Sequence, residues 1–140
     1  VIASAGGNPW DRTLFDVCPG AISAATVSKD QGIMILVAEC VEGLGRFLSA
    51  QPGLHKSGEQ VTQSRRAFTL ERLVEHSLQR LCTDHRVYLV STLPEHQALA
   101  YNLLAAKSVG NALQRAIRHA GKDATVALMS HCSVTAPIVG

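Results

Sequence analysis

The sequence predicts an α/β fold, a three-layer domain with an open, mostly parallel sheet of about four strands and helices on both faces. The first observation behind this prediction is that the strand-like runs, such as residues 33–39, are almost continuously apolar and do not alternate. Such runs are typical of parallel strands covered on both sides. The second is that helix-like periodicity fills the intervals between these runs, so that strand and helix signals alternate along the chain.

Four short segments have the composition of strands. Residues 1–4 end at a pair of glycines, and residues 33–39 include the longest apolar run of the chain. Residues 86–91 and 124–129 are enriched in Val and Leu. We expect these four segments to pair into one sheet, because consecutive strands joined by helical connections usually lie side by side.

Two helices are predicted in the first half. Apolar residues at helical spacing indicate a helix from Asp11, which can cap it, to about residue 25. We expect a kink or a restarted helix at Pro19 and Gly20, because proline cannot donate the helical hydrogen bond. A second apolar stripe covers residues 70–81 behind the N-cap candidate Thr69.

Two more helices are predicted towards the carboxyl end. Pro94 opens one, since a missing N–H costs little at a helix start. Ser108 caps the other, which Gly121 ends. Residues 43–69 are the least regular, and we expect a short helix near 44–50 followed by a surface loop.

Length and composition are typical of one domain, residues 1–140, and the charge is nearly balanced. Hydrophobic residues make up 46% of the 140 positions, charged residues 17%, and the net charge is +2. No concentrated basic face indicates nucleic acid, and no apolar run reaches the ~20 residues of a membrane span, so neither nucleic acid nor membrane is an expected partner. We recognise no signal peptide, and because the chain opens without Met on a strand-like run we expect further polypeptide upstream.

The four cysteines, which include Cys40 and Cys132, form no CxxC pair and lie among apolar neighbours. They are interpreted as reduced thiols of a cytoplasmic protein. Cys40 beside Glu39 lacks the basic neighbour that an activated nucleophile needs. His131 and Cys132 are a weak ligand pair, because adjacent residues rarely converge on one metal, so no metal site is predicted.

Ligands of open α/β sheets gather at the carboxyl ends of the strands, which predicts four site segments. These are residues 4–11, 39–45, 91–94 and 130–135. In the first, Gly6 and Gly7 allow close approach of a ligand or a partner domain, although a tight turn alone explains them equally well. In the second, Glu39 and Glu42 are either general acids or bases, or caps that hold a loop.

Two of these segments carry a resemblance to a known family. Residues 4–11 read Ser-Ala-Gly-Gly-Asn-Pro-Trp-Asp, with Thr-Leu-Phe at 13–15, and residues 39–45 read Glu-Cys-Val-Glu-Gly-Leu-Gly. At this spacing they are similar to two blocks of the carboxy-terminal domain of the nickel-pincer lactate racemase family. Residues 87–91, the helix from Ser108 and residues 135–137 fit in register, so the resemblance covers nearly the whole chain.

The resemblance implies a carboxy-terminal α/β domain of a larger two-domain enzyme. A separate amino-terminal domain would bind the nickel pincer nucleotide through a covalent lysine and supply the nickel-binding, proton-exchanging histidines. The reaction proposed for the family is reversible hydride transfer between the α-carbon of a 2-hydroxy acid and the cofactor. The domain described by this sequence would close the cleft, with its own amino-terminal domain and a small 2-hydroxy acid as partners and with no catalytic or cofactor-binding residue of its own.

The family's site residues can be compared with this sequence one position at a time. The family's substrate-reaching tyrosine, glutamine and lysine fall at Phe15, Asp16 and Pro19, and Phe68 is nearest to an expected aromatic residue. Because the hydroxyl, the amide and the cation are replaced, we expect a substrate other than lactate, either a larger 2-hydroxy acid or a sugar acid. The residues expected to line the interdomain cleft are Gly6, Gly7, Asn8, Asp11, Phe15, Asp16, Glu39, Glu42 and Gly43.

Three functions are compatible with these observations. The leading hypothesis is a racemase or epimerase acting on a 2-hydroxy acid, of which this chain alone would be inactive. A dehydratase or another hydride-transfer enzyme on the same scaffold is the second, motivated by Pro19 at the lysine position. The third is a non-catalytic docking or regulatory domain.

Overall fold

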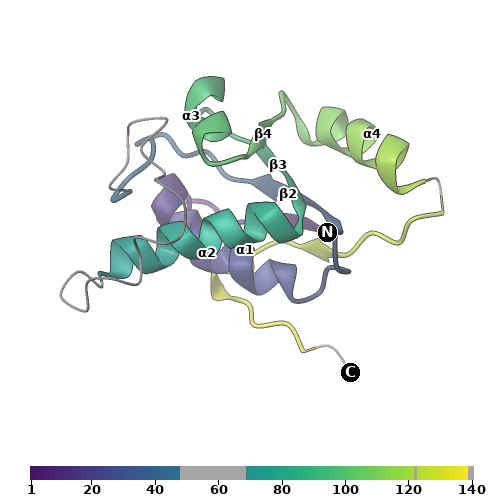
Figure 1. Ribbon diagram of the computed structural model, residues 1–140, viewed down its shortest axis with the longest axis horizontal. Coiled ribbons are helices and arrows are strands. Elements are labelled where there is room, and N and C mark those ends of the chain that lie inside the picture. Colours follow the sequence, from purple (N-terminus) through teal and green to yellow (C-terminus); the bar gives the residue numbers. More distant parts are fainter. Residues whose placement is uncertain (48–68, 122, 139–140) are drawn as a thin grey trace.

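The computed structural model of the chain describes residues 1–47, 69–121 and 123–138, and its centre is a parallel sheet (Figure 1). The sheet has five strands in the order β4-β3-β2-β1-β5, and every neighbouring pair is parallel. The strands are β1 (Ile2–Ser4), β2 (Ile33–Val37), β3 (Arg86–Val90), β4 (Leu104–Ala105) and β5 (Leu128–Met129). The expected α/β class with a parallel sheet is confirmed.

Helices cover both faces of this sheet, as predicted. Helices α1 (Leu14–Ala25) and α2 (Leu70–Asp84) pack against one face, and α4 (Val109–Ala120) packs against the other (Figure 1). Alternate residues of β2 point to opposite faces, so Met34 and Leu36 join the core under α1 and α2 while Ile35 joins the core under α4. Continuous apolar strands are therefore explained by burial on both sides.

Helix α1 starts later than predicted and does not restart. Its N-cap is Thr13, whose hydroxyl accepts from the Asp16 N–H at 3.2 Å, so the prediction of Asp11 as the cap is wrong. The helix runs as one element through Pro19 and Gly20. Pro19 leaves one carbonyl of the first turn without its helical donor.

The other helix boundaries follow their local signals. Thr69 caps α2, with its hydroxyl accepting from the Arg72 N–H at 3.4 Å. Pro94 directly precedes α3 (Glu95–Ala100). Ser108 caps α4 through a bond from the Asn111 N–H at 3.1 Å, and Gly121 ends α4 at φ +88°. These predictions are confirmed because a capping side chain acts on its own backbone.

Three segments differ from the expectation. Strand β4, only two residues long, was not predicted. Strand β5 includes only Leu128–Met129 of the expected residues 124–129, because residues 124–127 are exposed and do not pair as a strand. The helix expected at 44–50 is absent from residues 44–47, where the chain forms a turn, and its remainder lies outside the described residues.

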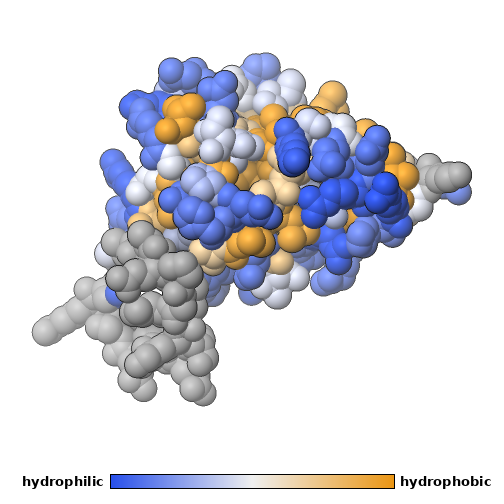
Figure 2. All heavy atoms as spheres, turned by 90° about the horizontal axis from the view of Figure 1, so that it is seen from above, coloured by the Kyte–Doolittle hydropathy of each residue, from blue (hydrophilic) through white to orange (hydrophobic). Residues whose placement is uncertain are grey.

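The face under α4 is less completely covered than the opposite one. Arg115 of α4 lies over the Tyr88 ring, 4.6 Å from its centroid, and donates to the Ala105 carbonyl at 3.0 Å. Leu128 in β5 and Ile117 in α4 remain 74% and 40% exposed. Figure 2 shows the side that carries α3 and α4, with apolar surface visible between polar side chains. No helix within the described ranges is long and apolar enough to cross a bilayer.

The short 3-10 helix η1 (Cys132–Val134) packs directly on α1. A Cβ at Gly20 would lie 2.8 Å from the Ser133 nitrogen and 2.9 Å from its Cα, closer than real contacts allow. We predict that Gly20→Ala lowers the free energy of unfolding by about 1–3 kcal/mol, because η1 must move away from α1.

The matched control for that change is Gly110→Ala in α4. A Cβ there meets only the Ser108 hydroxyl, at 3.9 Å, so the better helix propensity of alanine leaves stability unchanged or raises it by up to about 1 kcal/mol. Chemical denaturation of both variants checks the pair. Equal stabilities would contradict the close contact between α1 and η1.

Candidate functional site

The strand order places a topological switch point between β1 and β5. The chain adds β2, β3 and β4 in succession on one side of β1, and α4 then carries it back across the sheet to β5 on the other side. In open α/β sheets, ligands bind where the strand order reverses, at the carboxyl ends of the strands. This edge carries the loops that begin at Ala5 after β1 and at Ser130 after β5.

The loop after β1 presents its backbone to solvent. Gly6 and Gly7 have φ values of +102° and +83°, which only glycine adopts readily. Asn8 is exposed, and Trp10 is 47% exposed. Asp11, in contrast, is buried. The loop is therefore open to solvent around Asn8 and is anchored in the domain at Asp11.

The loop after β2 is bonded directly to residues 11–15. The Cys40 N–H donates to the Asp11 carbonyl at 2.8 Å, and the Leu14 N–H donates to the Gly43 carbonyl at 3.0 Å. The Asp11 carboxylate accepts from the Glu39 N–H at 3.3 Å, so Asp11 holds this loop in place. The two segments singled out in the sequence thus lie together at one edge of the sheet.

A glycine makes this approach possible. Gly45 has φ +71°, and a Cβ on it would lie 2.7 Å from the Thr13 Cβ and 3.1 Å from the Phe15 Cβ. Phe15 is only 9% exposed and packs edge-on against Phe47, with 5.6 Å between ring centroids. Phe15 therefore supports the loop from within the domain.

The carboxylates at this edge have different surroundings. Glu42 pairs with Arg12, whose Nε lies 2.8 Å from its Oε1, and both side chains are half exposed. Asp16 is exposed and accepts from the Thr13 hydroxyl at 2.6 Å. The exposed Glu39 side chain has no hydrogen bond or ion pair with any residue in the described ranges. Glu39 is thus an exposed carboxylate without a partner among the described residues.

The loops after β3 and β5 complete the edge. Thr92 fastens the first of them, donating its N–H and its hydroxyl to the Glu39 carbonyl at 2.9 and 2.7 Å. His131 lies over the glycine loop, since a Cβ on Gly6 would be 3.0 Å from its Cδ2. The sequence singled out His131 only as a possible metal ligand with Cys132. Its position beside Gly6 depends on β5 pairing with β1, which no local pattern indicates.

The thiols of this domain are protonated at neutral pH. Burial raises the pKa of Cys40 to about 12, with Asp11 and Asp16 adding to the effect, and burial alone raises the pKa of Cys82 to about 12. Neutral, buried thiols are poor nucleophiles and poor metal ligands.

The described residues do not offer a donor set for nickel. No three His, Cys, Asp or Glu side chains within those ranges come together as a metal site requires. The nickel cofactor that the resemblance implies therefore fits no set of side chains among the described residues.

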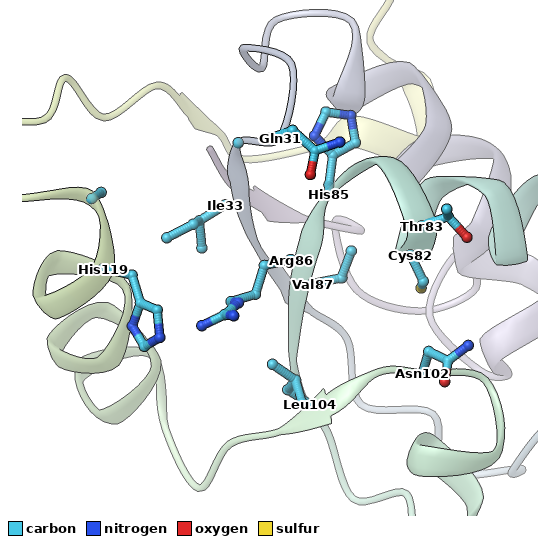
Figure 3. A pocket seen from close by; sticks show the side chains of 12 residues that line it. Gln31, Ile33, Cys82, Thr83, His85, Arg86, Val87, Asn102, Leu104 and His119 are labelled. Atoms are coloured by element: carbon cyan, nitrogen blue, oxygen red, sulfur yellow. The ribbon is translucent and has the colours of Figure 1, made fainter.

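A hollow lies at the opposite, amino edge of the sheet. It measures about 530 Å³ and surrounds the start of β3, where Arg86 and His119 point towards one another (Figure 3). Helices α2 and α4 both end there, at Asp84 and Ala120. Because helix carboxyl ends carry partial negative charge, Arg86 is explained as a partner of the helix ends, and the His119 Nδ1 lies 3.0 Å from the Arg115 carbonyl of its own helix.

The family follows from comparison with known proteins. A family model described as the lactate racemase C-terminal domain matches residues 1–135. The chain belongs to the lactate racemase C-terminal domain family. Its membership agrees with the sheet edge described above, because the two sequence blocks that suggested the family form the two joined loops.

Relatives of this domain family are longer. Lactate racemase of Thermoanaerobacterium thermosaccharolyticum is 25% identical over an aligned stretch of 133 positions, and the match covers 90% of this chain and 31% of that protein. The structure of the lactate racemase apoprotein from the same organism superposes with a TM-score of 0.78 at 20% identity, over 94% of this chain and 33% of that one. The chain therefore spans about a third of the relative's length and shares its fold.

We predict that Gly45→Ala destabilises the domain more than Gly43→Ala. Both positions have positive φ, which costs alanine about 1–2 kcal/mol, but only at Gly45 does a Cβ meet other atoms. The contact with Thr13 should add about 1–3 kcal/mol to the loss. Urea denaturation of the two variants measures the difference, and equal losses would show that the loop is not docked as described.

We predict slow alkylation of Cys40 in the folded chain at pH 8. With a pKa of about 12, about one thiol in 10⁴ is ionised, against about a quarter in the unfolded chain at a pKa near 8.5. The pKa of Cys40 is higher in the folded chain than in the unfolded chain, so ionisation of the thiol favours unfolding. The contribution of the protonated thiol to the free energy of unfolding is therefore fully present below pH ~8.5 and is lost as pH rises towards 12. Iodoacetamide labelling followed by peptide mass spectrometry checks the prediction, and labelling of the folded and unfolded chains at equal rates would contradict it.

Proposed function

We propose that this chain is the substrate-facing carboxy-terminal domain of a racemase or epimerase that acts on a 2-hydroxy acid. Family membership supports the enzyme class. The observation that carries the domain's role is the docking of residues 39–45 on residues 11–15 beside the switch point, which builds one continuous edge from the two family blocks. Closure of such an edge over a substrate excludes water and completes a site shared between domains.

In this proposal the amino-terminal domain of the same polypeptide holds the nickel pincer nucleotide. When bound, that cofactor would accept and return hydride at the substrate α-carbon. The proposal assigns it to the other domain because no donor set gathers among the residues described in this one. The role left to this chain is to bind, orient and enclose the substrate.

The cleft residues then fall into two groups. Gly6, Gly7, Asn8 and Glu39 present backbone or free polar groups at the edge. Asp11 and Phe15 lie beneath them and hold the loops, as do the Arg12–Glu42 pair and the Gly43 carbonyl. Asp16 is exposed on α1 and available to a substrate.

The substrate is proposed to differ from lactate. Where the family resemblance places a tyrosine, a glutamine and a lysine, this chain has a buried phenylalanine, Phe15, an aspartate, Asp16, and an exposed proline, Pro19. A pocket that lacks these donors loses the contacts that a small hydroxy acid requires. A larger 2-hydroxy acid or a sugar acid can obtain its binding energy elsewhere in the cleft.

We predict that the full-length protein, loaded with cofactor, interconverts the two stereoisomers of at least one acid in a panel of 2-hydroxy and sugar acids. Chiral chromatography of the products measures this, with the protein prepared without cofactor as the control. Loaded protein that isomerises no acid in the panel would contradict the proposal. An unsaturated or keto product would instead favour a dehydratase or another hydride-transfer enzyme.

A further inference from the structure

A histidine occupies the switch point beside the glycine loop. The His131 ring lies against Gly6, and a Cβ at Gly6 would lie only 3.0 Å from its Cδ2, a tighter contact than most side chains make. Both residues directly follow paired strands, Gly6 after β1 and His131 after β5. This is the position where open α/β sheets bind their ligands.

The glycine loop beside this ring offers two backbone donors, at Gly7 and Asn8. The Gly6 N–H donates to the Ser4 hydroxyl at 3.3 Å. The N–H groups of Gly7 and Asn8 donate to no acceptor among residues 1–47, 69–121 and 123–138. Successive free N–H groups in a glycine turn favour an anion, because their dipoles converge on one point.

The ring of His131 is oriented by its neighbours. Its Nδ1 lies 3.0 Å from the Ser130 hydroxyl. Its carbonyl accepts from the Thr135 hydroxyl at 2.7 Å and from the Val134 N–H at 3.2 Å, which fixes the backbone. The Ser130 hydroxyl can donate to Nδ1, and the ring then carries its proton on Nε2, which has no partner in the described part of the chain.

The carboxylates at this edge do not strongly repel an anion bound beside His131. Asp11 is buried and accepts from the Glu39 N–H, and Asp16 accepts from the Thr13 hydroxyl. The free carboxylate of Glu39 follows β2, two strands away from β5. At a strand spacing of about 4.8 Å, that separation is on the order of 10 Å, where solvent and salt screen most of the repulsion.

We infer that the Gly7 and Asn8 N–H groups together with the His131 Nε2–H form a binding site for the carboxylate of a 2-hydroxy acid. This inference rests on the proposed function and deepens it, because it names the group of the substrate that this domain holds. Ser130 is a positioning residue that sets the histidine tautomer. The rest of the acid extends from this point into the cleft.

Steady-state kinetics of the full-length, cofactor-loaded protein test the inference on whichever acid it isomerises. His131→Ala should raise KM about ten- to a hundredfold with kcat within a few-fold, since one hydrogen bond to a charged group is lost. His131→Gln, whose amide can donate in place of Nε2–H, should recover part of the loss. His96→Ala, at an exposed histidine on α3, is the control and should behave like the wild type. An unchanged KM in His131→Ala overturns the inference and leaves the proposed function intact.

A direct binding experiment tests the carboxylate site separately from the proposed isomerase function. In full-length protein labelled with ¹⁵N-glycine, ¹⁵N-asparagine and ¹⁵N-histidine, glycolate should shift the Gly7 and Asn8 amides, and ethylene glycol, which lacks the carboxylate, should not. The ring ¹⁵N signals should report the Nε2–H tautomer, and Ser130→Ala should shift the balance towards Nδ1–H. If no acid is isomerised but glycolate shifts both amides, the proposed function fails and the carboxylate site stands. Amides that do not respond to glycolate overturn the site.

Discussion

Four backbone hydrogen bonds join residues 11–15 to residues 40–44, and the site depends on them. They bring the loop after β2 onto the start of α1, so that two segments nearly thirty residues apart form one surface. Glycine is required at Gly45, where φ is positive and Thr13 occupies the space of a side chain. The buried Asp11 carboxylate adds a further bond to the Glu39 N–H.

The two edges of the sheet differ in the polar groups that they present to a ligand. The carboxyl edge carries the backbone N–H groups of Gly7 and Asn8 and the imidazole of His131, with the Glu39 carboxylate two strands further along the sheet. At the amino edge, Arg86 and His119 lie where helices α2 and α4 end, and the positive charge of Arg86 complements the partial negative charge of helix carboxyl ends.

Much of the fold was predictable from the sequence because its signals are local. Thr69, Ser108 and Gly121 act on backbone groups within their own helix ends, and apolar runs report burial on both sheet faces. Asp11 was predicted to cap α1, but Thr13 caps it, and a tertiary contact explains the difference, since the Asp11 carboxylate accepts from the Glu39 N–H. Strand β4 has two residues and no period to detect. The role of His131 could not be predicted, because it follows from β5 lying beside β1, a consequence of strand order and not of spacing.

The central claim is that the carboxyl edge of this sheet faces the substrate. Hydrogen–deuterium exchange of the full-length, cofactor-loaded protein, with and without the 2-hydroxy acid that it isomerises, tests it most directly. The account predicts that the acid slows exchange in residues 6–8 and 39–45, while residues 82–87 around the opposite hollow exchange at unchanged rates. Protection confined to residues 82–87, with none at the glycine loop, would contradict it.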